Sequence, residues 1–137
     1  MKKKLSVIFS SLALLLVMIV TFCACSNYGN VKRKYKSEGW TESEDCIKLQ
    51  ESLLKSALGE DYEETCTIHA LAKNGSRLNY VVILEFKSTD EMKKKIDESA
   101  TLKGIVKDVQ NSDFISGNCV LLFSMTSEGR EIFKSTK

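Results

Sequence analysis

Hydrophobic and polar residues follow two different periods between Thr41 and Lys137, and together they predict a single α+β domain. Apolar residues recur at helical spacing from Cys46 to Leu58, and Gly59 follows them as a stop signal. The preceding sequence, Thr41-Glu-Ser-Glu44, matches a capping box, in which a hydroxyl and a carboxylate satisfy the first backbone amides of a helix. We therefore expect an amphipathic helix over 41–58.

Two strands joined by a tight turn are predicted next. Residues 65–72 alternate in the way expected of a strand with one buried face. The sequence Lys73-Asn-Gly-Ser76 predicts a hairpin turn, because asparagine and glycine accept the positive φ angles that such turns require. The run 78–86 is β-branched and aromatic, and it is apolar on both faces between Tyr80 and Leu84. It is expected to be the central strand.

A second helix is predicted after this strand. Ser88-Thr-Asp-Glu91 repeats the capping-box pattern, and Met92, Ile96 and Ala100 then fall on one helical face. Gly104 is expected to end this helix.

The C-terminal part predicts one buried strand and one short helix. Ile105–Val109 fits either a short edge strand or an irregular connection, and Ser116-Gly-Asn118 predicts a turn. Cys119–Met125 is a buried strand, and Ser127 is expected to cap a final helix carrying Ile132 and Phe133. The element order is thus α-β-β-α-(β)-β-α. It favours a small, mostly antiparallel sheet of three to four strands with helices packed on one face.

The N-terminal residues have a pattern of their own, which is typical of an export signal. Lys2, Lys3 and Lys4 precede an apolar segment, Leu5–Phe22, whose densest stretch is 12–20. A membrane-spanning helix usually needs about 20 consecutive apolar residues, so this segment is short for a permanent anchor. The small residue Ala24 before Cys25 suits a cleavage site.

The sequence Phe22-Cys23-Ala24-Cys25 resembles the lipobox of bacterial lipoproteins. It departs from the usual pattern at Phe22, where an aliphatic residue is common, and at Cys23, where a small residue is common. The resemblance implies that residues 1–24 are a signal peptide, that Cys25 carries a lipid such as palmitate, and that the protein is held at the extracytoplasmic face of the cell membrane. Plain secretion and an uncleaved apolar anchor are the alternatives.

Removing the signal changes the charge balance. The full chain has 20 basic and 18 acidic residues, whereas residues 41–137 have 13 basic and 17 acidic. An acidic domain argues against nucleic acid as a partner. The stretch 25–40 has two glycines and weak apolar periodicity, so we expect a flexible, lipid-anchored tether. Its basic residues either contact anionic headgroups or wall polymers, or simply keep a solvated linker extended; they are Lys32, Arg33, Lys34 and Lys36.

Signals of catalysis and of cofactor or metal binding are missing from the sequence. It has no glycine-rich phosphate loop, paired zinc knuckle or G-x-S-x-G elbow, and its one histidine is His69. Cys66 and His69 stand three apart on a predicted strand, so their side chains should point to opposite faces. The cysteines of the domain lie among apolar neighbours, where burial makes a thiol inert and raises its pKa. We therefore predict no catalytic residue, metal or cofactor.

The domain contains three cysteines, Cys46, Cys66 and Cys119, and export permits a disulfide between two of them. The favoured pair is Cys66–Cys119, if their strands are neighbours with side chains on the same face. Reduced cysteines that fill the core are the alternative, since free cysteine is among the most buried residue types. The acidic run Glu60–Glu64 could bind calcium or a basic partner, but it lacks the pattern of a calcium loop, which favours a solvated turn.

Two classes of function fit these observations best. The first is a membrane-anchored, non-catalytic binding or accessory domain for a protein or cell-envelope partner. The second is an inhibitor or immunity-type lipoprotein whose acidic domain meets a basic enzyme or toxin. An enzyme that uses a cysteine is a weaker third class, because it would need an accessible thiol of low pKa.

Overall fold

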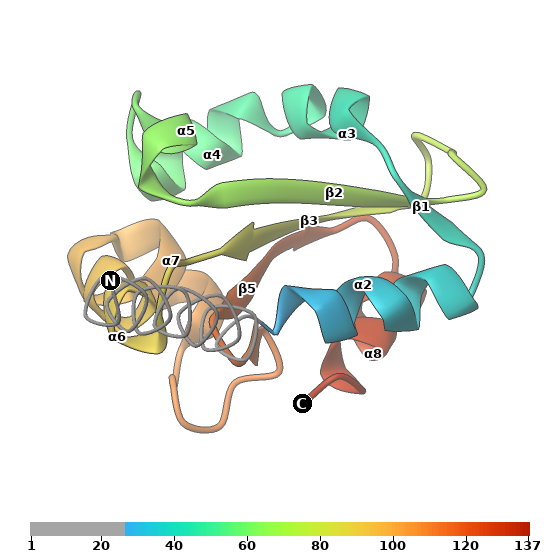
Figure 1. Ribbon diagram of the computed structural model, residues 1–137. Helices are drawn as coiled ribbons and strands as arrows, with labels where there is room; N and C mark the ends of the chain where they lie inside the picture. The colour runs from blue at the N-terminus through green and yellow to red at the C-terminus, as the bar shows by residue number, and fades with distance from the viewer. Residues whose placement is uncertain (1–26) are drawn as a thin grey trace, which may run out of the picture.

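The computed structural model describes residues 27–137, and the predicted signal peptide and Cys25 lie outside this range. The chain folds around a five-stranded sheet in the order β1-β2-β3-β5-β4, in which every pair of neighbours is antiparallel (Figure 1). The predicted α+β class and antiparallel sheet are confirmed, although the strand count was underestimated. The strands are β1 (Trp40–Glu42), β2 (Thr67–Lys73), β3 (Tyr80–Glu85), β4 (Ile115–Ser116) and β5 (Cys119–Ser124).

The β2–β3 hairpin and the central position of β3 are confirmed. Asn74 and Gly75 have φ angles of 53° and 71°, as the turn prediction requires. Strand β3 lies in the middle of the sheet and is buried over its first five residues. A strand covered on both faces needs apolar side chains at successive positions, which explains its unbroken apolar sequence.

Helices cover both faces of the sheet, so the prediction of helices on one face was wrong (Figure 1). One face packs against five helices: α3 (Glu44–Leu49), α4 (Glu51–Leu58), α5 (Tyr62–Thr65), α6 (Thr89–Glu98) and α7 (Ala100–Val106). The other face packs against α2 (Tyr28–Ser37) and α8 (Ser127–Lys134). The sheet therefore lies between two helical layers, each with its own apolar core.

The stretch expected to be a flexible tether is part of the fold. Residues 28–37 form helix α2, whose side chains Tyr28, Val31 and Tyr35 are buried on the sheet. Trp40 is 1% exposed and begins β1, with its ring edge-on to Tyr35. The prediction failed because the apolar stripe of α2 has only three members, with three charged residues between the second and the third. Burial against the sheet supplies the stability that this short stripe cannot supply in isolation.

The first predicted helix starts later than expected and is divided. Thr41 pairs with Ala72 in the β1–β2 ladder, so the predicted capping box is not formed. The helical segment begins at Glu44 and is interrupted at Gln50, whose side-chain amide donates a hydrogen bond to the hydroxyl oxygen of Tyr80 at 2.7 Å. Gly59 ends the second part with a φ angle of 94°, which confirms the predicted stop.

The second predicted helix is also divided. Ser88 caps α6 by accepting a hydrogen bond from the Glu91 amide, as predicted. Ser99 then caps a further helix, α7, which continues through Gly104 to Val106. The expected stop at Gly104 and the optional strand over 105–109 were therefore wrong.

The C-terminal part follows the prediction more closely. The edge strand is β4, and it is joined to β5 through the predicted turn at Ser116-Gly-Asn118. The last helix carries buried Ile132 and Phe133 as expected, with Thr126 rather than Ser127 as its cap.

Candidate functional site

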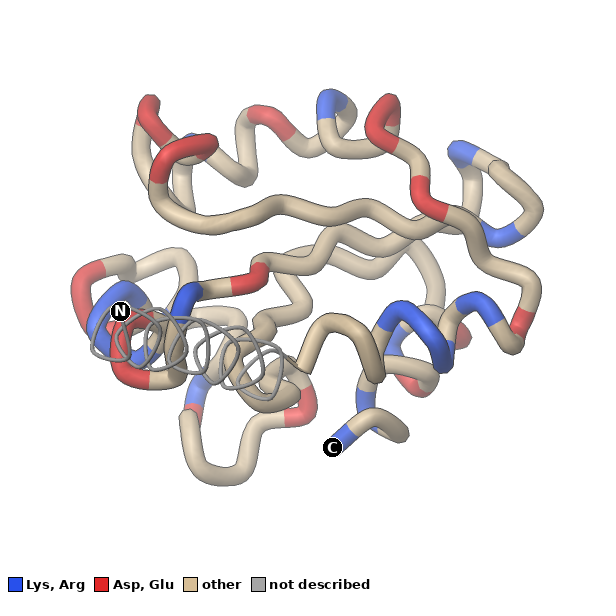
Figure 2. The backbone as a smooth tube through the Cα atoms, in the orientation of Figure 1, with Lys and Arg blue, Asp and Glu red and all other residues tan. Residues whose placement is uncertain are grey.

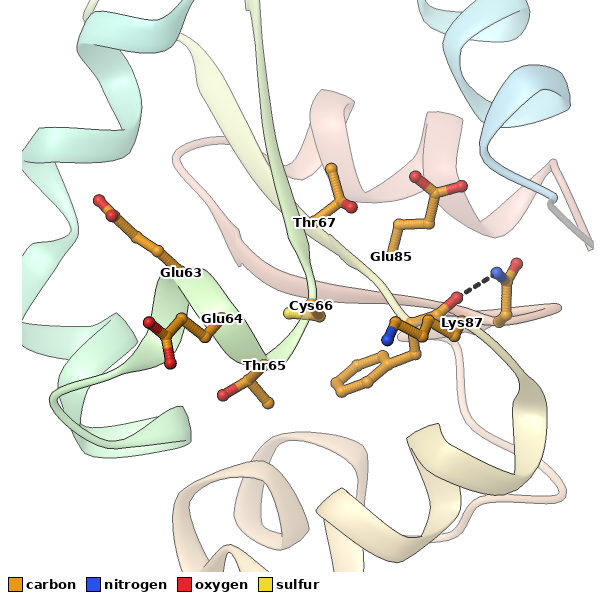
Figure 3. Close-up of a pocket in the computed structure, with 9 residues that line it drawn as sticks. Glu63, Glu64, Thr65, Cys66, Thr67, Glu85 and Lys87 are labelled. Atoms are coloured by element: carbon orange, nitrogen blue, oxygen red, sulfur yellow. Dashed lines mark hydrogen bonds between the residues drawn. The ribbon is translucent and has the colours of Figure 1, made fainter.

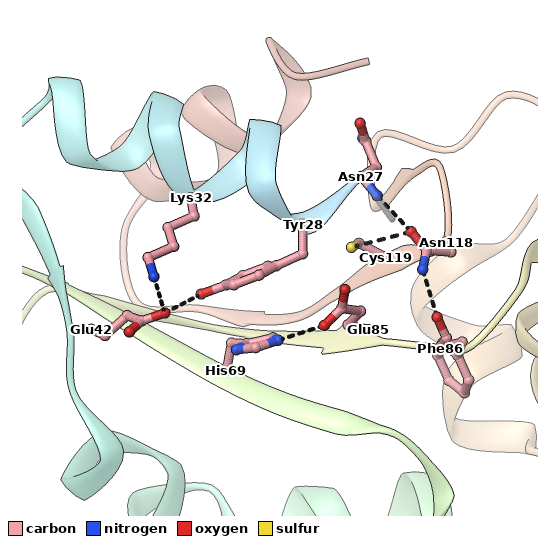
Figure 4. A network of polar contacts seen from close by, with 9 residues as sticks. All are labelled: Asn27, Tyr28, Lys32, Glu42, His69, Glu85, Phe86, Asn118 and Cys119. Carbon is pink, nitrogen blue, oxygen red and sulfur yellow. Dashed lines mark hydrogen bonds and ion pairs between the residues drawn. The ribbon is translucent and has the colours of Figure 1, made fainter. Parts of the chain in front are cut away.

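The beginning of α2 is fastened to the turn between β4 and β5 (Figure 4). The Asn27 amide N–H donates to Asn118 Oδ1 at 2.9 Å, and its side-chain amide donates to Ser116 Oγ. The Thr136 hydroxyl also donates to Ser116 Oγ, at 2.9 Å. A Cβ at Gly117 would lie 2.6 Å from the Asn27 Cβ, so only glycine allows this approach. Residue 27 is therefore held by contacts with the C-terminal part of the chain.

A polar network attaches α2 to the sheet (Figure 4). The Tyr28 ring stacks on His69 with centroids 3.5 Å apart, and His69 Nε2 lies 2.9 Å from Glu85 Oε1. The Tyr28 hydroxyl donates to Glu42 Oε1 at 2.9 Å, and Lys32 Nζ lies 3.2 Å from the same oxygen.

The protonation states of Tyr28 and Glu42 are fixed at neutral pH. Burial, reinforced by Glu42, raises the pKa of Tyr28 far above its usual range. The hydrogen bond from Tyr28, together with Lys32, lowers the pKa of Glu42 although partial burial opposes this. Near neutral pH the Tyr28 phenol stays protonated and the Glu42 carboxylate stays ionised, so neither group exchanges a proton as a general acid or base would. The two groups therefore serve to position α2.

The four basic residues singled out in the sequence all lie on α2. Lys32 is half-buried and paired with Glu42, whereas Arg33, Lys34 and Lys36 are exposed. No acidic residue occurs over 28–37, so these three exposed side chains form what we term the basic face of α2. Membrane contact by these residues stays a prediction.

Acidic residues gather on the opposite side of the sheet. Residues 44–65, which include α3, α4 and α5, contain seven acidic and two basic residues. Figure 2 shows these acidic positions along the α3–α5 layer and basic positions along α2, with the sheet between them. The near-balanced net charge of the chain therefore conceals two surfaces of opposite sign.

A groove follows the free edge of β2 beneath α3 and α5. It consists of two adjoining clefts, of about 420 and 310 Å³, that share Ile47, Tyr62, Glu63 and Ile68. Glu42 and Glu44 line its end next to β1. Three half-buried apolar side chains thus lie beside three carboxylates. We call this the β2-edge groove, and sequence reasoning missed it because it depends on where β1 ends.

A smaller pocket of about 250 Å³ lies beside Cys66, at the start of β2 (Figure 3). Glu63 and Glu64 enter it from α5, and Glu85 and Lys87 from the end of β3 and the loop after it. Burial raises the pKa of Cys66 to about 12, so its thiol is protonated at neutral pH. Within residues 27–137 no cluster of three or more histidine, cysteine or acidic side chains could hold a metal ion.

The predicted Cys66–Cys119 disulfide is not formed. Cys46, Cys66 and Cys119 are all free thiols. Strand β3 separates β2 from β5, and Cys66 packs toward the α3–α7 layer while Cys119 packs toward α2. Burial raises the pKa of Cys119 to about 12, in the direction expected for a thiol among apolar neighbours.

The expected separation of Cys66 and His69 is also confirmed. Cys66 joins the core beneath α3–α7, while the His69 ring stacks on Tyr28 at the opposite face. The acidic run Glu60–Glu64 overlaps α5, a single helical turn, and its four acidic side chains are exposed.

Among residues 27–137, no helix has the length and apolar content needed to cross a membrane. Comparison of the chain with models of protein families, with curated proteins and with solved structures finds no match. The functional argument therefore rests on the sequence and on the two charged surfaces and the groove described above.

Proposed function

We propose that this protein is a membrane-anchored extracytoplasmic lipoprotein whose domain is a non-catalytic binding or accessory module for a protein or cell-envelope partner. The observation that carries this proposal is the separation of charge across the sheet, with the basic helix beginning next to the expected lipid site. Tyr28 is three residues after Cys25. The anchor and the basic face of α2 would thus act on the same side of the domain.

Chain length limits how far the domain can lie from a lipid on Cys25. Only Ser26 stands between Cys25 and Asn27, and Asn27 is fastened to the β4–β5 turn. Two residues span at most about 7 Å, so the start of α2 would lie at the depth of the lipid headgroups. A flexible tether of sixteen residues would allow the domain any orientation relative to the membrane, whereas this short connection restricts that orientation.

The basic face of α2 favours an orientation in which this helix lies against an anionic leaflet. Each basic residue near such a surface contributes about 1 kcal/mol, and a basic patch adds to the binding supplied by acyl chains. The α3–α5 layer, on the other side of the sheet, would then point away from the membrane. Its negative charge suits a basic partner.

The same acidic layer supports a second candidate function, an inhibitor or immunity-type lipoprotein that binds a basic enzyme or toxin. Binding through complementary charge predicts association rates that fall steeply as salt is added. An accessory domain that holds a wall polymer would lack this dependence if the polymer is neutral. Crosslinking and affinity capture from the native membrane, at low and high salt, would separate the two.

Metabolic labelling with a fatty-acid analogue tests the anchor. The wild-type chain is expected to incorporate the label, and the Cys25→Ala variant is expected to lose it. Label that persists in Cys25→Ala would contradict lipidation at this residue. Cys23→Ala is the matched control, because it changes a neighbouring cysteine and should still be labelled.

Spin labels test the orientation of the domain. The full chain carrying Lys34→Cys or Glu51→Cys is labelled and reconstituted into vesicles that contain phosphatidylglycerol, with a nickel-chelating lipid as the relaxing agent. The label at position 34 should relax strongly and the label at 51 weakly, because the sheet lies between α2 and α4. Equal relaxation at both positions would overturn the proposed orientation.

A further inference from the structure

Strand β2 is only partly covered by its outer neighbour. Strand β1 pairs with the last three residues of β2, from Leu71 to Lys73. The Ser43 amide then donates to the Ala70 carbonyl at 2.9 Å, and the chain turns away into α3. Among the described residues, no strand pairs with the first half of β2 on this side. That half of the edge forms the floor of the β2-edge groove.

The alternation of an antiparallel strand determines which backbone groups face the groove. The Lys73 amide donates toward the β3 side, to the Asn79 carbonyl. Residues of β2 that lie an odd number of positions from Lys73 must point their backbone groups toward β1. The hydrogen bond from the Ser43 amide to the Ala70 carbonyl confirms this. Both backbone groups of Ile68 therefore face the groove, and within residues 27–137 they have no backbone partner. Ser43 lies opposite Ala70 and covers that part of the edge.

The groove is suited to one kind of occupant. Its apolar side chains, Ile47 and Tyr62, would pack against alternate residues of an added strand, while carboxylates at both ends would pair with basic side chains. The carboxylates are Glu42 and Glu44 next to β1 and Glu63 on α5, with Lys48 as the one basic residue lining the groove. A second copy of this edge would bring acidic residues together, which disfavours self-pairing.

We propose that an extended basic segment of a partner protein adds to the sheet as a short strand opposite Ile68, following on from β1. This proposal rests on the proposed binding function, because it states the chemistry of the partner that the domain would bind. It does not require the lipid anchor. Open strand edges are usually covered or charged to prevent aggregation. Here Glu42, Glu44 and Glu63 would protect the free edge from other acidic edges and attract lysine and arginine.

Amide exchange on the full chain in detergent micelles tests this directly. The probe is a capped Lys-Val-Lys-Val-Lys-Val peptide, and the matched control peptide has glutamate in place of lysine. The basic probe should slow exchange of the Ile68 amide by about tenfold or more, because it gains a hydrogen bond. The amides of His69, which points to β3, and of Ala70, which lies opposite Ser43, should change little. Failure of the basic probe to protect Ile68 would overturn the proposal.

Two sets of variants separate the backbone from the charges. Ile68→Pro removes the outward N–H and should weaken binding of the basic probe about fivefold, whereas Ile68→Val keeps the N–H and should bind like the wild type. The double variant Glu44→Lys, Glu63→Lys should weaken binding about tenfold or more at low salt. Asp90→Lys, Asp97→Lys on α6 is its matched control and should bind normally.

The remaining outcomes are also decisive. Equal binding by the groove double variant and its α6 control would refute the charge argument, and unaffected binding by a folded Ile68→Pro would refute strand addition. Protection of Ile68 that rises with protein concentration without peptide would show that a second copy occupies the edge. Absence of the fatty-acid label from the wild-type chain would refute the anchor and leave this proposal standing.

Discussion

Replacing Tyr35 by alanine tests whether α2 belongs to the cooperative fold or is a tether. Tyr35 is fully buried, its ring meets Trp40 edge-on with centroids 5.3 Å apart, and its hydroxyl donates to the Gly129 carbonyl at 2.6 Å. These contacts join α2 to β1 and α8. If they form in solution, their removal must lower the stability of the whole domain.

The expected loss can be divided into a packing part and a hydrogen-bond part. Truncation of a buried aromatic residue to alanine costs about 3–5 kcal/mol, and a buried hydrogen bond contributes about 0.5–1.5 kcal/mol. Tyr35→Ala should therefore lower the free energy of unfolding by about 4 kcal/mol or more. Tyr35→Phe keeps the ring and should cost about 1 kcal/mol. Lys36→Ala, at the next and exposed position, should change stability by less than about 0.5 kcal/mol.

Urea unfolding of the full chain provides the measurement. The protein has one tryptophan, Trp40, which is buried beside Tyr35, so its fluorescence reports the unfolding of this region. A Tyr35→Ala variant as stable as Lys36→Ala would refute the packing of α2 on the sheet. In that case residues 28–37 would be the tether that their composition suggested, and the proposed membrane orientation would fail with it.

Three further predictions concern the core and the helices. Gly104→Ala in α7 should stabilise the domain by about 1 kcal/mol, because the added Cβ meets nothing within 4 Å. Gly129→Ala in α8 should destabilise the domain by about 1–3 kcal/mol, because the added Cβ would lie 2.7 Å from Val81 Cγ1. Shifts of the thermal unfolding temperature with the same sign in both variants would contradict this. Ser99→Ala should cost about 1 kcal/mol by removing the cap of α7, and an unchanged urea midpoint would show that the cap is dispensable. Burial raises the pKa of Cys119 to about 12 in the folded protein, whereas the thiol has a pKa of about 8.5 in the unfolded chain. The thiol therefore contributes its full stabilisation below about pH 8.5. Between about pH 8.5 and 12 the free energy of unfolding falls by up to about 1.4 kcal/mol per pH unit, because only the unfolded chain loses the proton. Cys119→Ala should therefore reduce the slope of stability against pH between 9 and 11, and an unchanged slope would refute the burial of this thiol.

Elements whose signals are local could be predicted from the sequence. The Asn74-Gly75 turn, the Ser88 cap and the unbroken apolar run of β3 each depend on a few adjacent residues. Local signals failed where a distant contact overrode them. Thr41 looks like a helix cap, but pairing with β2 keeps it in a strand, and the break at Gln50 coincides with a hydrogen bond to Tyr80.

The candidate surfaces were only partly accessible to sequence reasoning. The basic cluster and the acidic excess could be counted, but their separation by the sheet requires the topology. Tyr28, Val31 and Tyr35 do stand at helical spacing, and this was the one signal in the sequence that could have identified α2. The β2-edge groove had no such signal, because it exists only where β1 leaves β2 at Ser43.

The basic face of α2 points away from the β2-edge groove, yet two residues that line the groove also contact α2. Glu42 accepts a hydrogen bond from Tyr28 and pairs with Lys32, and it also lines the groove. His69 stacks beneath Tyr28 and lines the same groove. The ion pair between Lys32 and Glu42 is only partly buried and contributes about 1 kcal/mol or less, so a basic side chain entering the groove can replace Lys32 at Glu42 at little cost. Lys32 would then join the basic face of α2 on the membrane side, so occupation of the groove and contact with an anionic surface should favour each other.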